Sequence, residues 1–191
     1  MISDFQEILL ASASPRRAEL LKRAGIGFTV DPVEVEEFDS CPDIRKLPEL
    51  NAALKADTSA ILHPEKLVLG ADTMIIFENR AIGKPADTDD ARAMLRAFSG
   101  QSHEVITGMA LVCREKSFRK IWSETSVVTF KNLDDETISR YLDQVEVLDK
   151  AGAYAIQEHA DLIISSYTGE LANIIGLPLK QLLLTISNAN Q

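Results

Sequence analysis

Short apolar runs alternate with capped helical segments along most of the chain, and this alternation constrains the fold more than any other feature. The first run, Phe5 to Leu10, leads into Ser14-Pro15, a typical helix start with serine as the N-cap and proline as the first helical residue. The last helix is expected to begin near Pro178. Interleaved strands and helices predict an α/β fold with a mixed sheet, and no linker or repeat divides residues 1–191 into separate domains.

Turn residues and caps set the expected boundaries of the elements. Strands are expected at residues 5–10, 28–30, 105–113 and 121–130, and in the segments "GAYAIQ" and "DLIISSYTG". Helices are expected from Pro15 to a stop at Gly25, at residues 48–62, from a Thr88 cap to Phe98, and at residues 134–144.

The middle of the chain holds two less regular features. The helix 48–62 is predicted to bury Leu50, Leu54 and Ile61. The segment "KLVLGADTMIIF" that follows it gives two apolar runs, broken at residues 70–72 by "GAD". The acidic, proline-containing stretch 31–48 has no clear period and is expected to be a long irregular connection, of a kind that often carries function.

Composition excludes several classes of partner. The chain has 29 acidic and 20 basic residues, a net charge of -9, and therefore lacks the broad positive surface that nucleic acid polymers require. A small polyanion can still bind where a few cations gather in one cleft. No segment approaches the roughly 18 to 20 apolar residues of a membrane span. Cys41 and Cys113 show no disulfide or zinc spacing, so a soluble cytoplasmic protein is expected.

The helix start in "SASPRR" is the first candidate site. Free backbone N–H groups, the hydroxyls of Ser12 and Ser14, and the guanidinium groups of Arg16 and Arg17 could together bind phosphate oxygens. The alternative is an ordinary capped helix with solvated arginines. Helix-end electrostatics alone leaves both open.

Isolated charges supply further candidates, each with a simpler alternative. Asp72 interrupts an apolar strand and could face a metal or a cation, or it could be a turn aspartate. Lys84 in "IGKP" is a restrained lysine or a surface charge. In "EVEEF", Glu37 could join Asp72 as an oxygen ligand for Mg²⁺ or Mn²⁺, or the run could be a solvated connection. His103 opens a strand and is given a structural role.

Eight motifs, in order and at about the family's spacing, resemble those of the Maf family, also called septum formation inhibitor-like proteins. They are "SASPRRAELL", the Glu36-Glu37 pair, "LKA" around Lys55, "GADT", "GKP", "GQSHEVITG", "GAYAIQ" and "NIIGLPL". The resemblance spans roughly residues 8–183. It implies an elongated mixed sheet with flanking helices and two lobes around a cleft, as in inosine triphosphatase-like proteins. It also implies hydrolysis of nucleoside triphosphates to the monophosphate and pyrophosphate with a divalent metal.

The resemblance also implies roles for individual residues. Asp72 matches the proton acceptor, and Glu37, or its neighbour Glu36, matches the acid that helps to hold the metal with Asp72. The phosphate-binding positions are matched by Ser12, Arg16, Arg17, Lys55 and Lys84.

Three further matches concern substrate choice. Arg16, Thr73 and Gln157 match the branch associated with dTTP and UTP. Without the resemblance, the Gln157 amide could hydrogen-bond to the edge of a base, or Gln157 could simply end a strand. Glu158 departs from the glycine that often follows this glutamine, which affects the expected base preference rather than the reaction.

Other functions remain open at the level of sequence. The family name suggests a nucleotide-binding regulator of cell division or septum formation. A housecleaning pyrophosphatase for other modified nucleotides, or a general phosphatase, is a further alternative. The resemblance also suggests a homodimer.

Overall fold

The computed structural model describes residues 7–189, so the expected strand residues Phe5 and Gln6 lie outside the described part. The chain divides into two compact units. The first contains the described residues up to Thr73, residues Thr107–Glu124 and the residues from Gly176 onward; the second contains Met74–Ile106 and Thr125–Ile175.

The seven strands of the described residues form a mixed sheet of order β2-β1-β3-β5-β6-β7, with β4 paired to β3. Three long strands contribute residues to both units: β3 (Leu67–Phe77), β5 (Ser102–Cys113) and β6 (Phe118–Phe130). Neighbours pair in parallel at β1–β2 and β1–β3, and antiparallel at β3–β4 and β6–β7. The mixed α/β class predicted from the alternation is confirmed.

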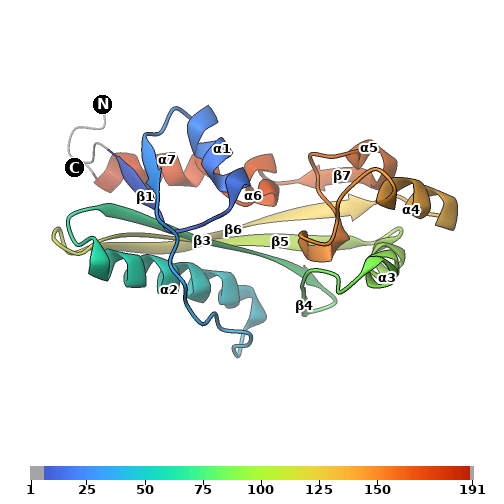
Figure 1. Ribbon diagram of the computed structural model, residues 1–191, viewed down its shortest axis with the longest axis horizontal. Helices are drawn as coiled ribbons and strands as arrows, with labels where there is room; N and C mark the ends of the chain where they lie inside the picture. The colour runs from blue at the N-terminus through green and yellow to red at the C-terminus, as the bar shows by residue number, and fades with distance from the viewer. Residues whose placement is uncertain (1–6, 190–191) are drawn as a thin grey trace. The chain divides into compact units, whose positions relative to one another are not determined.

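In the first unit, two helices lie on one side of the strands and one on the other (Figure 1). Helices α1 (Pro15–Arg23) and α7 (Leu179–Ala189) share one side, and α2 (Leu47–Leu62) covers the opposite side. The short strands β1 (Ile8–Leu10) and β2 (Phe28–Val30) flank α1, and the 3₁₀ turn η1 (Ile44–Lys46) precedes α2. Gly25, at a φ of 67°, ends α1 as predicted.

The buried face of α2 consists mainly of small residues, and the three large ones that the periodicity predicts are not among its buried residues. Leu50 and Ile61 are exposed and Leu54 is half-buried, so that prediction is wrong. The buried residues are Leu47, Pro48, Asn51, Ala52, Ala53, Ala56, Ser59 and Ala60.

Close approach of α2 to the sheet explains this inversion. A Cβ atom added to Gly70 would lie 2.2 Å from the Ala52 carbonyl oxygen, and one added to Gly108 would lie 2.1 Å from the Pro48 carbonyl carbon. At such a separation a large side chain cannot fit between helix and strands at these points, so alanines occupy the contact, and Leu50 and Ile61 are exposed.

The polar break at residues 70–72 is not a turn. Strand β3 runs without interruption from Leu67 to Phe77, and Asp72 lies inside it. Gly70 is required by the contact with α2, and the largely buried Asp72 side chain pairs with a lysine described below. The two predicted apolar runs are therefore one strand, and the alternative of a turn aspartate is wrong.

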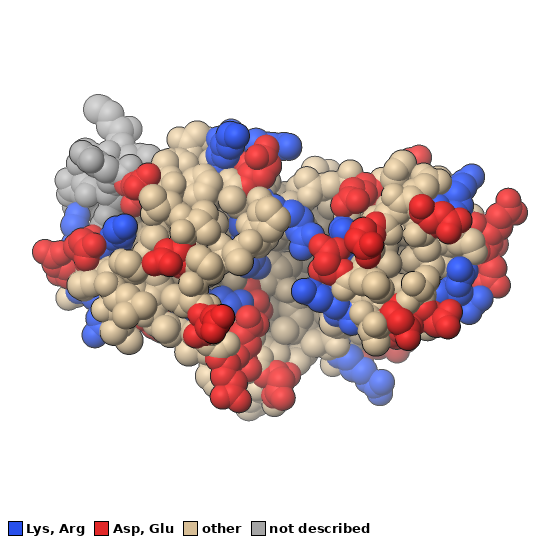
Figure 2. All heavy atoms as spheres, viewed as in Figure 1, with Lys and Arg blue, Asp and Glu red and all other residues tan. Residues whose placement is uncertain are grey.

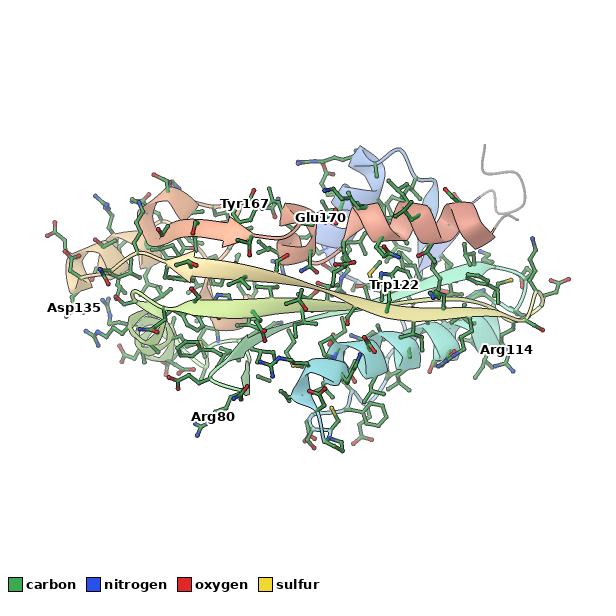
Figure 3. The ribbon with its side chains drawn as sticks, turned by 180° about the vertical axis from the view of Figure 1, so that it is seen from behind. Arg80, Arg114, Trp122, Asp135, Tyr167 and Glu170 are labelled. Atoms are coloured by element: carbon green, nitrogen blue, oxygen red, sulfur yellow. The ribbon has the colours of Figure 1, made fainter. Side chains whose placement is uncertain are left out.

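The second unit contains short helices around strands β4 (Arg80–Ile82) and β7 (Ile164–Thr168). Its helices are α3 (Thr88–Phe98), α4 (Asp135–Leu142), η2 (Ala151–Ala153), α5 (Ala160–Ile163) and α6 (Leu171–Ile175). Figure 3 shows Asp135 at the start of α4 and Tyr167 on β7.

Several boundaries in this unit differ from the predictions. The N-cap of α3 is Asp87, whose carboxylate accepts a hydrogen bond from the Asp90 N–H at 2.8 Å, and not Thr88. The segment "GAYAIQ" is not a strand, because Gly152 and Ala153 have positive φ values and form part of η2. The first residues of "DLIISSYTG" belong to α5, and α4 ends two residues earlier than predicted, at Leu142.

Aromatic rings in the core of the second unit enclose a histidine. The rings of Phe98, Phe130 and Tyr154 lie 4.8, 5.7 and 5.5 Å from the His103 ring, measured between centroids. Burial lowers the pKa of His103 to about 4, so the ring is neutral at pH 7. This environment agrees with the structural role predicted for His103.

Candidate active site

Helix α1 directs its two adjacent arginines differently. Arg16 is exposed, whereas Arg17 extends its guanidinium into the first unit. Ser14 has extended backbone angles at the N-cap, but its side chain makes no capping bond; instead, its N–H donates to the Ser12 hydroxyl at 3.3 Å. Ser12 thus links the helix start to Arg17.

Three neutral oxygens hold the Arg17 guanidinium. Nη1 donates to Ser12 Oγ at 2.8 Å, Nε to the Gly176 carbonyl at 3.0 Å, and Nη2 to Thr73 Oγ1 at 3.1 Å. Burial lowers the pKa of Arg17, and the nearby Asp72 carboxylate opposes that shift. A guanidinium has five N–H donors, so two make no bond to the residues that the structure describes, and N–H groups of this kind can bind an anion.

A lysine bridges two carboxylates beside this arginine. Lys55 Nζ on α2 lies 2.9 Å from Asp72 Oδ1 on β3 and 2.9 Å from Glu37 Oε1 on the connection before α2. The Lys55 and Asp72 side chains are only 12% and 13% exposed, whereas Glu37 is 48% exposed. Of the adjacent acids Glu36 and Glu37, it is Glu37 that contacts Lys55.

The connection that carries Glu37 is irregular, as predicted, and acidic side chains gather along it (Figure 2). Asn51, buried on α2, fixes it: Nδ2 donates to the Phe38 carbonyl at 3.1 Å, and Oδ1 accepts from the Phe38 N–H at 2.9 Å. The side-chain amide of Asn51 thereby satisfies both the N–H and the carbonyl of Phe38, the residue that follows Glu37. The side-chain position of Glu37 thus depends on Asn51 as well as on Lys55.

Lys84 and Gln157 belong to the second unit, and both are exposed. Lys84 follows Gly83, whose carbonyl accepts a hydrogen bond from the Gly152 N–H at 2.9 Å. Within the same unit this bond ties the Lys84 loop to the segment that leads to Gln157.

The loop around Gln157 has two further anchors. The buried Tyr141 hydroxyl accepts a hydrogen bond from the Ala155 N–H at 3.1 Å, and burial raises the pKa of Tyr141 to about 12. The Glu158 carboxylate lies 3.7 Å from the buried Lys150 ammonium. The residue that departs from the family pattern therefore pairs with a lysine of its own loop.

Six predicted site residues thus meet in the first unit: Ser12, Arg17, Glu37, Lys55, Asp72 and Thr73. Sequence reasoning did not single out Asn51, Thr107 or Gly176, which contact this group or its supporting loop. Asn51 and Thr107 share one signal, a polar side chain at a buried position of an apolar element. Gly176 has a φ of 125°, which no periodicity reveals.

Across residues 7–189, no three His, Cys, Asp or Glu side chains are grouped so that they could hold a metal ion. Within the same residues no helix is long and apolar enough to cross a membrane.

The fold resembles that of a solved structure. The Staphylococcus aureus Ham1 protein superposes with a TM-score of 0.55 over 97% of this chain and 100% of that one, at 15% sequence identity.

Sequence comparison gives closer relatives. The Maf-like protein family matches residues 7–189. A dTTP/UTP pyrophosphatase of Akkermansia muciniphila is 42% identical over 179 residues, which cover 92% of this chain and 93% of that protein. A dTTP/UTP pyrophosphatase of Alkaliphilus oremlandii is also 42% identical, over 96% of both chains. With a family match across nearly its whole length and relatives this similar, the chain belongs to the Maf family.

Proposed function

We propose that the protein is a nucleoside triphosphate pyrophosphatase that converts dTTP and UTP to the nucleoside monophosphate and pyrophosphate. The observation that carries this proposal is the arrangement of Arg17, Lys55 and Asp72 in the first unit. Lys55 and Asp72 form a buried ion pair, and Asp72 lies close enough to Arg17 to oppose the lowering of the Arg17 pKa. The relatives named dTTP/UTP pyrophosphatase support the substrate class.

In the proposed reaction, water attacks the α-phosphorus. A new P–O bond forms to the water oxygen, the bridging P–O bond to the β-phosphate breaks, and pyrophosphate leaves with that bridging oxygen. Asp72 orients the water and accepts its proton, while Arg17 and Lys55 stabilise the negative charge on the phosphate oxygens. Transfer to phosphorus depends on positioning and charge neutralisation more than on covalent chemistry, which suits this set of side chains.

The carboxylates of Asp72 and Glu37 also suit a divalent cation. Mg²⁺ is commonly bound by one or two carboxylates together with substrate phosphates, so these two oxygen donors fit a metal that arrives with its nucleotide. Their convergence on the same Lys55 ammonium places the two acids at one point. When bound, Mg²⁺ or Mn²⁺ would neutralise phosphate charge and acidify the attacking water.

Base preference rests on the family resemblance. The Gln157 amide can both donate to and accept from the imide edge of a pyrimidine, and Arg16 is exposed and free of the contacts that hold Arg17. Lys84 retains its proposed part in phosphate binding. Replacing Gln157 with Glu removes the amide donors and is expected to lower kcat/KM for dTTP and UTP.

A nucleotide panel with Mg²⁺ or Mn²⁺, scored separately for pyrophosphate and orthophosphate, tests the proposal. We expect pyrophosphate from dTTP and UTP in both metals and no activity after chelation. Orthophosphate as the released product would indicate a phosphatase instead. Strong activity on modified nucleotides beside weak activity on dTTP and UTP would shift the substrate assignment.

We further propose that the protein is a cytoplasmic homodimer. Cys41 and Cys113 are both free thiols, which agrees with a reducing compartment. Light scattering coupled to size-exclusion chromatography measures the molar mass and tests the dimer. A monomer mass at micromolar concentration would contradict it.

A further inference from the structure

Thr107 is a fully buried polar residue in the apolar strand β5. Its hydroxyl lies 3.0 Å from the hydroxyl of Thr73 on the neighbouring strand β3. Both residues belong to the first unit. Burying a hydroxyl in an apolar strand lowers stability unless a hydrogen bond compensates, so a polar residue at this position calls for a specific partner.

Thr73 is the link between Thr107 and the arginine. Thr73 Oγ1 accepts a hydrogen bond from Arg17 Nη2 at 3.1 Å and lies 3.5 Å from the Gly176 carbonyl oxygen. A hydroxyl has one proton and two lone pairs, so contacts with Arg17, Thr107 and Gly176 use its whole capacity. The rotamer of Thr73 is therefore set by Thr107 on one side and by Arg17 on the other.

Gly176 limits movement from the opposite direction. Its carbonyl accepts the Arg17 Nε–H at 3.0 Å, and a Cβ atom added there would lie 3.3 Å from Thr73 Oγ1. With a φ of 125°, this position favours glycine for its backbone angle as well as for its contacts. Arg17 is thus enclosed by acceptors whose own positions are fixed.

We propose that Thr107 is a positioning residue, which holds Thr73 and through it aims the two remaining N–H donors of Arg17 at the substrate phosphates. This inference rests on the proposed function for the substrate, but the anion-binding step can be measured without turnover. It also gives Thr73 a second role, because its hydroxyl serves Arg17 in addition to any part in substrate choice.

Three substitutions at this position separate the hydroxyl from the side-chain volume. Thr107→Val replaces the hydroxyl with a methyl group at a distance shorter than a normal carbon–oxygen contact, so it removes the bond and displaces Thr73. Thr107→Ala removes the bond without crowding. Thr107→Ser keeps the hydroxyl. Thr185→Val is the matched control, since Thr185 is a buried threonine of the same unit whose hydroxyl donates a hydrogen bond to the Gln181 carbonyl of its own helix at 2.8 Å.

Calorimetric titration with tripolyphosphate and Mg²⁺, together with steady-state kinetics on dTTP, tests the proposal. For Thr107→Val and Thr107→Ala we expect Kd for tripolyphosphate and KM for dTTP to rise about tenfold, the effect of one lost buried hydrogen bond. Thr107→Ser and Thr185→Val should stay within about twofold of the wild type.

The outcomes separate this inference from the proposed function. Circular dichroism first establishes that Thr107→Val and Thr107→Ala are folded. If both variants then bind tripolyphosphate as tightly as the Thr185→Val control does, the positioning role is wrong, even if the wild type hydrolyses dTTP as proposed. If the wild type hydrolyses no nucleoside triphosphate, the proposed function fails, while the tripolyphosphate Kd values still decide the role of Thr107.

Discussion

The two units of the molecule differ in the surroundings that they give to a titratable group buried in a long strand. The first unit buries a lysine–aspartate pair and holds a buried arginine by hydrogen bonds to neutral acceptors. The second encloses its buried histidine in aromatic rings and keeps it uncharged. Charge taken out of water lowers stability unless it is compensated, so its retention in the first unit favours a role in binding anions. A neutral ring in an apolar core needs no such role.

This contrast shows that burial of a titratable group is not itself a sign of catalysis. Asp72 and His103 are both buried in long strands. Their surroundings differ: Asp72 faces two cations, whereas the His103 Nε2 atom has no hydrogen-bond partner among the described residues. Only the surroundings of Asp72 bring cations and a carboxylate together, so that they could bind a phosphate group and act on it.

The largest expected effect comes from removing the carboxylate of Asp72. Asp72→Asn keeps the size of the side chain and an oxygen for Lys55, but it cannot accept the proton of the attacking water. We expect kcat on dTTP to fall by at least about 100-fold, typical of a lost general base, and the melting temperature to fall as well, because the buried Lys55 ammonium loses one of its two carboxylate partners. Asp57→Asn, which breaks the exposed pair with Arg119 in the same unit, is the control and should keep wild-type kcat. Wild-type turnover by Asp72→Asn would contradict the catalytic role and favour a nucleotide-binding regulator.

The next effect concerns the packing that brings Lys55 to Asp72. Gly108→Ala places a methyl group on the Pro48 backbone of α2, which must then move away from the sheet. We expect a loss of about 3 kcal/mol in the free energy of unfolding, measured by urea denaturation. Gly83→Ala in the second unit is the control, because an added Cβ meets nothing within 4 Å there. Equal stability of the two variants would mean that α2 does not approach the sheet this closely.

The histidine of the second unit supplies a prediction about pH. The unfolded chain binds a proton at His103 near pH 6.5, whereas the folded protein does so only near pH 4, so this residue makes stability fall as pH drops through that window. His103→Phe should reduce the fall between pH 6.5 and 4 by up to about 3 kcal/mol. Urea midpoints across this range measure it, with exposed His159→Asn as the control. An unchanged pH profile in His103→Phe would show that the ring is not buried as a neutral group, and a fall in kcat at pH 7 would show that it takes part in the reaction.

The smallest effect is expected at Glu158. Its pair with Lys150 is half exposed and 3.7 Å long, and Lys150 also pairs with Asp149 at 2.8 Å. Glu158→Gln should therefore change kcat/KM for dTTP and UTP by about twofold or less. Glu136→Gln on the same unit's surface is the control. A tenfold change in the ratio of kcat/KM for dTTP to kcat/KM for UTP would instead place Glu158 in contact with the base.

The sequence predicts the order of elements well but not the depth of their contacts. Ser14-Pro15 and Gly25 mark both ends of α1, because caps act locally. The pattern of α2 predicts the wrong buried face because Gly70 and Gly108, which lie on strands and not on the helix, decide how near the helix lies to the sheet. The sequence indicates a break in the strand at Asp72 because it does not show that Lys55 compensates the buried carboxylate.

The candidate site was only partly predictable for the same reason. The charged residues Arg17, Lys55 and Asp72 lie in recognisable motifs, and the structure brings them together in one unit. Their supports, Asn51 and Thr107, could not be identified, since a polar residue in an apolar element has meaning only when its partner is known.

Hydrolysis of dTTP in ¹⁸O-labelled water tests the central claim most directly, because it reports which phosphorus the water attacks. Attack at the α-phosphorus, as proposed for the group around Arg17, Lys55 and Asp72, puts the label in dTMP and leaves pyrophosphate unlabelled. Label in pyrophosphate with none in dTMP would contradict this account of the reaction.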